Sequence, residues 1–252
     1  IAIGDGDKDY DISKSELSRI SSSGVVTIGG STSGSIYVNN VSGAESNNIT
    51  GMLTLDATND NAQVIFETAE STFNSITARA NSGIDVDVNL ITDTGDLILD
   101  GDSSISGNTS DKIEINNTSS LISARDVILD AESGGILANG NFTVEAGRDI
   151  RLNDALNISH ELNLLADQNT SGEGSIYTQG DIISGNNNIT LRSADIELSN
   201  SINAGSASVN MVSSGSAMGL GLYDDVDYNL SNDEILKITA ANLIVGDDIS
   251  GE

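Results

Sequence analysis

The sequence contains no cysteine, no proline and no tryptophan, and it has a single histidine, His160. The absence of cysteine excludes disulfides, thiolate catalysis and cysteine-ligated metal sites. The absence of proline is typical of a chain in which every backbone N–H is needed as a donor between strands. Because aromatic residues make up only 3% of the chain, its core must consist of Ile, Leu, Val and Ala, which suits a narrow core of many similar layers.

Positive charge is also scarce, with 10 Lys and Arg against 38 Asp and Glu and a net charge of −28. Such a surface repels nucleic-acid phosphates and anionic lipids, so we expect neither as a partner. The chain has no apolar stretch long enough to insert into a membrane. Adaptation to salty water is an alternative explanation of the acidic composition.

Short segments with apolar residues at alternate positions recur along the chain, separated by Gly, Asn, Asp and Ser. This alternation places two apolar side chains on one face of a short β-strand. The residues between the segments favour turns and positive φ angles. The apolar pairs are Leu53/Leu55, Val64/Phe66, Val86/Val88, Leu97/Leu99, Ile113/Ile115, Val127/Leu129, Phe142/Val144, Ile150/Leu152, Leu162/Leu164, Ile189/Leu191, Ile196/Leu198 and Val209/Met211.

The spacing of these pairs predicts a parallel β-helix, an all-β fold in which coils of two or three strands stack on one another. Phe142 precedes Leu162 by 20 residues, and Ile189 precedes Val209 by the same number. The step from Leu162 to Ile189 is 27, and we assign the excess to a polar insert at residues 167–174. Roughly ten coils about 4.8 Å apart would form a rod on the order of 50 Å long. The competing prediction is an array of β-sandwiches, which usually have an aromatic core anchor and longer strands.

If the chain is a β-helix, inward residues of successive coils form one continuous apolar column. The sequence places four residues in this column: Leu129, Val144, Leu164 and Leu191.

A longer repeat links the two ends of the chain at an offset of about 218 residues. Asp9-Tyr10 matches Asp227-Tyr228, and Ser13-x-x-Glu16 matches Ser231-x-x-Glu234. Ser-x-x-Glu before an apolar run is a capping box, so we expect short helices at Ser13–Ile20 and Ser231–Thr239. We therefore divide the chain into a repeat junction with a capping-box helix (1–34), β-helix coils (35–217) and the start of the next copy (218–252), and we expect it to be a segment of a longer protein.

The segment from Gly219 to Gly251 and the coils Ala146–Leu152 and Gly180–Ile183 resemble the recurring segments of filamentous-haemagglutinin-type giant bacterial adhesins. The resemblance covers nearly the whole chain, although the individual coil motif is degenerate. It implies a right-handed β-helix, secretion across the outer membrane, often by a two-partner system, and a role in attachment or aggregation.

An acidic run at residues 5–16 has the spacing of an EF-hand loop. Asp5, Asp7, Asp9 and Glu16 supply oxygen ligands that suit Ca²⁺, the one candidate cofactor, although Tyr10 replaces the glycine that such a loop needs at its sixth position. The alternative is a solvated entry to the capping box, in which Glu16 bonds to the backbone and is not available to a metal.

Three classes of function remain open. The first is a structural or adhesive repeat of an extracellular or bacterial cell-surface fibre, with partners among host or neighbouring-cell surfaces, glycans, like chains and adjacent repeats of the same chain. The second is a Ca²⁺-dependent S-layer or extracellular matrix module. The third is a β-helix polysaccharide lyase or glycosidase, which is disfavoured because no arginine adjoins a dense carboxylate cluster and no Ser-His-Asp pattern surrounds His160. We therefore expect a protein that is not an enzyme.

Overall fold

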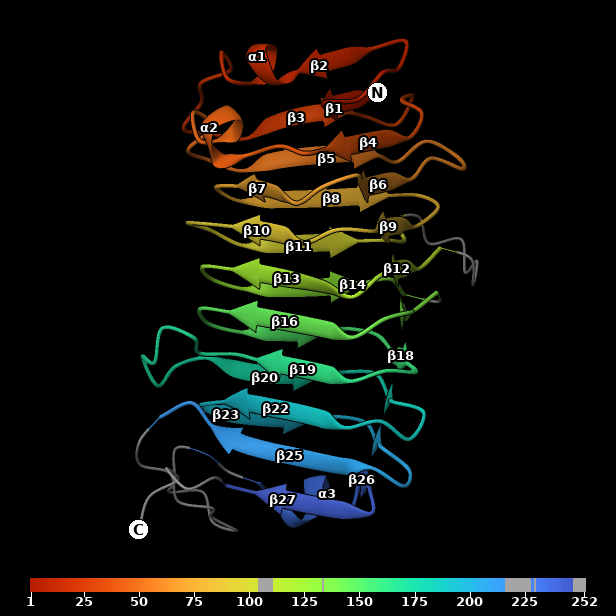
Figure 1. The fold of residues 1–252 in the computed structure, drawn as a ribbon, viewed down its shortest axis with the longest axis vertical. Helices are drawn as coiled ribbons and strands as arrows, with labels where there is room; N and C mark the ends of the chain where they lie inside the picture. Colours follow the sequence, from red (N-terminus) through yellow and green to blue (C-terminus); the bar gives the residue numbers. More distant parts are fainter. Residues whose placement is uncertain (104–110, 133, 216–227, 229, 247–252) are drawn as a thin grey trace.

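A computed structural model describes residues 1–103, 111–132, 134–215, 228 and 230–246. Within these ranges the chain winds into an elongated stack of short strands with three sides (Figure 1). The named strands pair in parallel throughout the described part of the chain, for example Leu97 with Val127 and Leu129 with Leu152. The parallel β-helix predicted from the spacing is therefore confirmed. The β-sandwich alternative is wrong, because sandwiches are built from antiparallel sheets.

The three sides are sheets of eleven, eight and eight strands, called here the long, front and rear sheets. The long sheet contains, in spatial order, β2 (Asp11–Ser13), β1 (Ala2–Gly4), β4 (Ile36–Asn39), β6 (Val64–Glu67), β9 (Ile84–Val86), β12 (Ile113–Ile115), β15 (Ile136–Ala138), β18 (Leu156–Ile158), β21 (Ile182–Ile183), β24 (Ile202–Asn203) and β26 (Ile238–Thr239).

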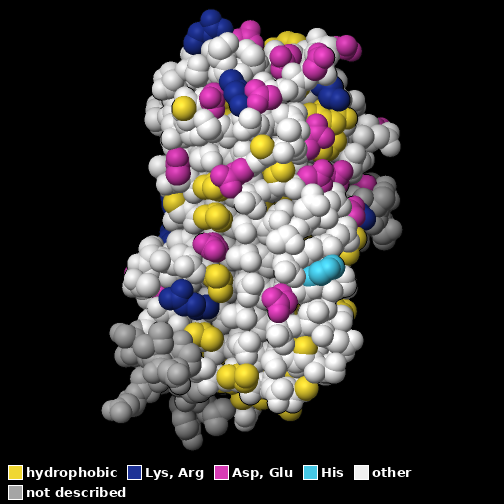
Figure 2. Space-filling view, viewed as in Figure 1, with side chains coloured by type: hydrophobic (Ala, Val, Ile, Leu, Met, Phe, Trp, Pro, Cys, Tyr) yellow, Lys and Arg dark blue, Asp and Glu magenta, His cyan; other side chains and the backbone are white. Residues whose placement is uncertain are grey.

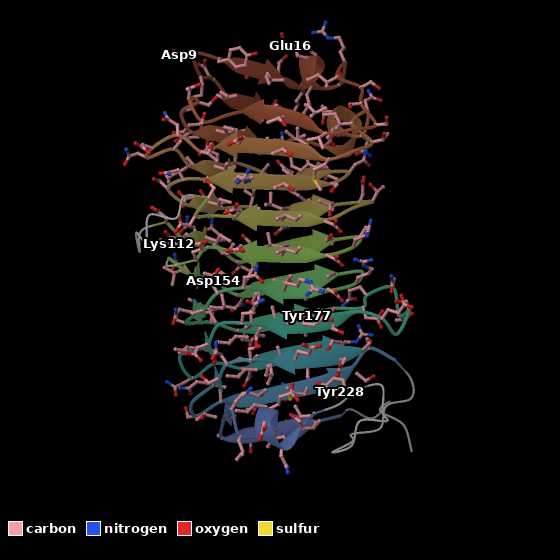
Figure 3. The ribbon with its side chains drawn as sticks, turned by 180° about the vertical axis from the view of Figure 1, so that it is seen from behind. Asp9, Glu16, Lys112, Asp154, Tyr177 and Tyr228 are labelled. Atoms are coloured by element: carbon pink, nitrogen blue, oxygen red, sulfur yellow. The ribbon has the colours of Figure 1, made fainter. Side chains whose placement is uncertain are left out.

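The front sheet faces the viewer in Figure 1, and the rear sheet faces the viewer in Figure 3. The front sheet contains β7 (Ser71–Phe73), β10 (Leu90–Thr92), β13 (Ser119–Ser123), β16 (Phe142–Ala146), β19 (Leu162–Leu165), β22 (Ile189–Ser193), β25 (Ser208–Ser213) and β27 (Asn242–Val245). The rear sheet contains β3 (Val26–Gly29), β5 (Leu53–Ala57), β8 (Ile76–Ala80), β11 (Leu97–Asp100), β14 (Val127–Asp130), β17 (Ile150–Leu152), β20 (Ser175–Thr178) and β23 (Asp195–Leu198).

The strand register follows the spacing of the apolar pairs. Phe142 pairs with Leu162, Leu162 with Ile189, and Ile189 with Val209. The longer second step arises where predicted, because residues 166–174 form a loop between β19 and β20. This loop folds around the buried carboxylate of Asp167, which accepts hydrogen bonds from the Ser171 N–H (2.8 Å), the Gly172 N–H (3.1 Å) and the Ser214 hydroxyl (2.6 Å). The extra residues thus leave the ladder at a corner and do not disturb the strands.

The interior is a single apolar column along the whole stack. Leu129, Val144, Leu164 and Leu191 are each 0% exposed, as the sequence predicted. The three phenylalanines of the chain are buried in the same column. Because side chains alternate along a strand, every second residue points outward and lines up with its partners in the coils above and below.

Three one-turn helices interrupt the strands: α1 (Lys14–Leu17), α2 (Gly43–Ser46) and α3 (Asn232–Ile235). Each has a capping box, so the predicted role of Ser13-x-x-Glu16 and Ser231-x-x-Glu234 is confirmed. Helices α1 and α3 are both shorter than expected: α1 ends at Leu17, and in the second copy residues 238–239 pair with β24 as a strand. Helix α2 was not predicted from the sequence. It contacts α1 on one side and β7 on the other, and so continues the front of the stack.

Candidate functional site

The outward side chains of the rear sheet form a column along the axis of the rod. The strand register places one residue from each strand in this column. In order the column contains Thr27, Thr54, Thr77, Ile98, Ile128, Arg151, Tyr177 and Glu197. Threonine and isoleucine suit a plain β surface, so the last three residues stand out as the ones with charged or aromatic groups.

Arg151 and Tyr177 are held together on adjacent strands. The Arg151 guanidinium lies 4.0 Å from the centroid of the Tyr177 ring, a cation–π contact. Its Nη2 also lies 2.7 Å from Oδ2 of Asp149. Burial by itself would lower the pKa of Arg151. The interactions with Asp149 and Tyr177 outweigh burial and raise the pKa overall, so the side chain keeps its positive charge. The pair is therefore ordered before any ligand arrives.

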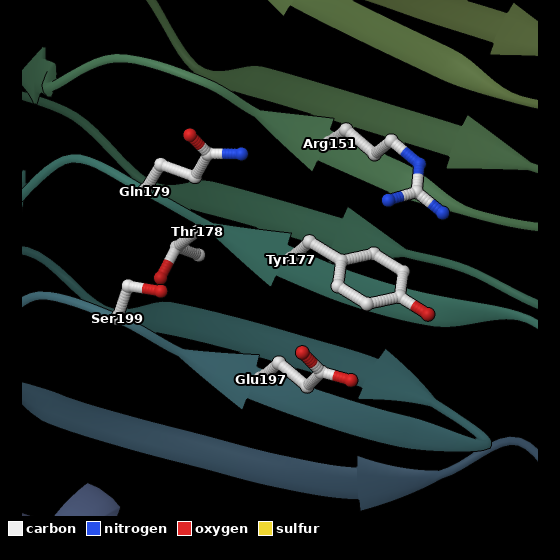
Figure 4. Close-up of a pocket in the computed structure, with 6 residues that line it drawn as sticks. All are labelled: Arg151, Tyr177, Thr178, Gln179, Glu197 and Ser199. Atoms are coloured by element: carbon white, nitrogen blue, oxygen red, sulfur yellow. The ribbon is translucent and has the colours of Figure 1, made fainter.

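A shallow hollow of about 300 Å³ lies beside this pair (Figure 4). Gln179 and Ser199 lie on its other side, and both are exposed. Thr178 is buried, and its Oγ1 has no hydrogen-bond partner in the described structure. The lining residues are Arg151, Tyr177, Thr178, Gln179, Glu197 and Ser199.

A second hollow of about 430 Å³ continues the first toward α3 and shares Glu197 and Ser199 with it. Helix α3 closes this end by bonding to the backbone of the last strand of the rear sheet. The Leu198 N–H donates to Oε1 of Glu234 (3.1 Å), and the Lys237 ammonium donates to the Leu198 carbonyl (2.6 Å). The two hollows together are called the rear groove.

The rear groove offers hydrogen-bond donors and acceptors side by side. Arg151 donates, Glu197 accepts, and Gln179, Tyr177 and Ser199 can do both. His160 lies outside it; its Nδ1 is 3.3 Å from the Ser159 hydroxyl on an exposed turn. The arrangement is therefore suited to holding a polar ligand by several hydrogen bonds.

The residues predicted to bind Ca²⁺ lie at the N-terminal end of the stack. Oδ2 of Asp5 accepts hydrogen bonds from Lys14 and from Asn40, each at 2.7 Å, and these bonds lower the pKa of Asp5. Oε2 of Glu16 accepts from the hydroxyl of Ser13 (2.7 Å) and its N–H (3.0 Å), so Glu16 acts in the capping box. Asp7 and Asp9 are exposed, and Figure 3 shows Asp9 and Glu16 apart at this end.

In the ranges that the structure describes, no three His, Asp or Glu side chains are grouped so that they could hold one metal ion. The Ca²⁺ site stays a prediction from the sequence. If it exists, millimolar Ca²⁺ raises the melting temperature, and Asp5→Asn combined with Asp7→Asn removes the rise. An equal response to Mg²⁺ would indicate charge screening and rule the site out.

Sequence reasoning missed the rear groove because its residues come from three strands and the region of α3, which are far apart in the chain. Arg151 pairs with Tyr177, and Tyr177 pairs with Glu197. The available signal was the coil length, because the same spacing that aligns inward residues also aligns outward ones. Because the coil from β17 to β20 contains the insert, a search for residues 20 positions apart does not align Arg151 with Tyr177.

No family model, curated protein or solved structure matches this chain. Among the described residues, none of the helices has the length and apolar character needed to cross a bilayer.

Proposed function

We propose that this chain is a structural and adhesive repeat segment of a large fibrous adhesin, secreted or held at a bacterial cell surface. The observation that carries the proposal is the unbroken stack of parallel coils together with a motif that recurs after about 218 residues. A stack that contains the same motif twice can be extended by repeating the segment between the two copies. Repeated units of this kind form a fibre whose length grows with the number of copies.

The front face of the stack discourages its sheets from associating side by side. Figure 2 shows acidic side chains spread over the front face and a broken line of apolar patches down its middle. Strand pairing accounts for the breaks, because Glu145 stacks between Ile122 and Leu165, and Arg192 stacks between Leu165 and Val212. Charged side chains that interrupt this outward-facing line of apolar residues discourage lateral association of sheets.

The proposed partners are a host or neighbouring-cell surface, its glycans, and like chains. Adjacent repeats of the same chain would join end to end. The net charge of −28 supports the exclusion of nucleic acid, because phosphates would be repelled.

Two measurements test this function. Small-angle scattering should give the profile of a rod. Beads coated with the chain should adhere to cultured epithelial cells, or to one another, more than albumin-coated beads do. A compact particle in solution, or adhesion no greater than that of albumin, would contradict the proposal. Release of unsaturated products from polygalacturonate, alginate or hyaluronan would favour a lyase instead.

A further inference from the structure

The rear groove is elongated along the rod and does not enter the core. Its two hollows share Glu197 and Ser199, and together they extend from β17 across β20 and β23 to α3. A shallow groove of this shape fits a short chain of linked rings better than a compact small molecule, which needs an enclosed pocket.

The groups in the groove match the surface of a sugar ring. Arg151, Gln179 and Glu197 end in planar groups, each with two nitrogen or oxygen atoms side by side, as needed to bond neighbouring hydroxyls. Tyr177 adds an aromatic ring and a hydroxyl at the same place (Figure 4). Tyrosine supplies the outward aromatic rings of the described coils, because all three phenylalanines are in the core and the chain has no tryptophan.

The groove is already ordered without a ligand. Arg151 is fixed by Asp149 and by the Tyr177 ring, and Asp149 also accepts a hydrogen bond from the Ser175 N–H at 3.0 Å. All of these residues belong to, or directly adjoin, strands that pair on both sides. Binding therefore requires little ordering of side chains, which favours affinity.

The charge of the groove restricts the class of sugar. Four carboxylates line it, from Asp195, Glu197, Asp233 and Glu234, against the two cations Arg151 and Lys237. Arg151 is also paired with Asp149, so the groove keeps a net negative charge. A uronate, sialylated or sulfated glycan would be repelled, whereas a neutral sugar is accepted and an amino sugar is attracted.

From these features we infer that the rear groove binds an oligosaccharide without acidic groups, with Tyr177 as the ring contact and Arg151, Gln179 and Glu197 as hydrogen-bonding partners. The inference rests on the proposed function, since it assigns the ligand by which the rod attaches to a glycan-bearing surface.

Titration calorimetry of the full chain tests the inference with three tetramers, those of N-acetylglucosamine, glucosamine and galacturonate. The first two should bind and the third should not. Added salt should weaken the glucosamine tetramer selectively, because only its binding includes attraction between charges. Tyr177→Ala should weaken both binding tetramers by at least about tenfold. Glu197→Gln should reduce the advantage of glucosamine over N-acetylglucosamine.

Tyr37→Ala is the matched control. Tyr37 lies on the outer face of β4 and also carries a cation, with Nζ of Lys8 at 3.9 Å from its ring centroid, but it does not line the rear groove. This variant should bind like the parent chain. The inference is overturned if neither uncharged nor amino tetramer binds, if galacturonate binds best, or if Tyr37→Ala loses as much affinity as Tyr177→Ala. Tyr177→Ala should keep the rod-like scattering of the parent and lose bead adhesion together with the tetramers. A parent chain that adheres to cells but binds none of the tetramers would overturn this inference and leave the proposed function standing.

Discussion

The two copies of the repeated motif place equivalent residues in opposite surroundings. Tyr10 is 64% exposed, whereas Tyr228, which occupies the same position in the second copy, is 0% exposed. Leu17 is 0% exposed in α1, whereas the equivalent Ile235 in α3 is 37% exposed. In the part of the chain that the structure describes, the first copy packs on coils that follow it and the second copy packs on coils that precede it. In this fold, burial of the motif therefore depends on which neighbouring coils are present.

The two copies also use different sheets. Helix α1 stacks on α2, whereas α3 bonds to the backbone of β23 through Glu234 and Lys237. The strand that follows α1, β3, belongs to the rear sheet, whereas β27, which occupies nearly the same place in the second copy, belongs to the front sheet. The motif thus determines the capped turn, and the free strand edges around it determine where the next strand pairs.

The largest difference between the copies is expected for the tyrosines. Tyr228→Ala leaves a cavity in a closed core and should lower the free energy of unfolding by about 3–5 kcal/mol. Tyr10→Ala changes an exposed side chain and should stay within about 0.5 kcal/mol. Urea unfolding followed by circular dichroism measures both. Equal effects would mean that the two environments do not differ in solution.

The aliphatic pair should differ in the reverse direction. Leu17→Ala removes a fully buried side chain and should cost about 2–5 kcal/mol. Ile235→Ala removes a partly exposed one and should cost less than half as much. Thermal melting of the two variants side by side checks the ranking. A larger loss for Ile235→Ala would show that the C-terminal end is covered in solution.

A smaller effect is expected for the cation that follows each helix. Lys237→Met removes the hydrogen bond to the Leu198 carbonyl and should cost about 1–2 kcal/mol. Arg19, its equivalent in the first copy, is exposed, so Arg19→Met should have little effect. Hydrogen exchange of the amides in β23 reports the difference directly, because only Lys237→Met should speed it. Faster exchange in both variants would point to a general loss of stability.

The ends and the middle of the stack should respond oppositely to pH. Hydrogen bonds from Lys14 and Ser13 lower the pKa of Asp5 and Glu16, so their stabilising contribution is lost as the pH falls through those lowered values. Burial raises the pKa of Asp85 in the middle, with Glu114 and Asp87 adding to the rise and Lys112 opposing it. The ionised carboxyl therefore opposes folding at neutral pH, and this opposition is lost as the pH falls through the raised pKa toward the usual value for aspartate.

Asp85→Asn should consequently raise the melting temperature at pH 7, by about 1 °C because solvent screens a half-buried group. The gain should shrink as the pH falls through the raised pKa of Asp85, because the parent carboxyl then becomes neutral as well. Melting curves across this range check the sign. A gain that grows on acidification would contradict the raised pKa.

The repeating part of the fold could be predicted from the sequence because register and burial there follow one spacing. The strand register was predicted from the spacing of Phe142, Leu162, Ile189 and Val209. The position of the loop was predicted from the polar residues after Ala166. Helix α2 was predictable in principle, because Ser42 and Glu45 repeat the capping-box spacing found at both ends. The burial of Tyr228 was not predictable, since the same Asp-Tyr pair is exposed at the other end. The rear groove required the register between coils, which local patterns do not contain.

The direction of the strand ladder has a mechanical consequence. Hydrogen bonds between coils lie along the long axis, so tension between the two ends pulls directly on the bonds of one coil at a time. The tension passes through every coil, but the end coil yields first because it has a neighbouring coil on one side only. Each released coil of about 20 residues supplies on the order of 65 Å of chain. If the proposed fibre is built in this way, it lengthens in steps under load before the bond at its point of attachment has to break.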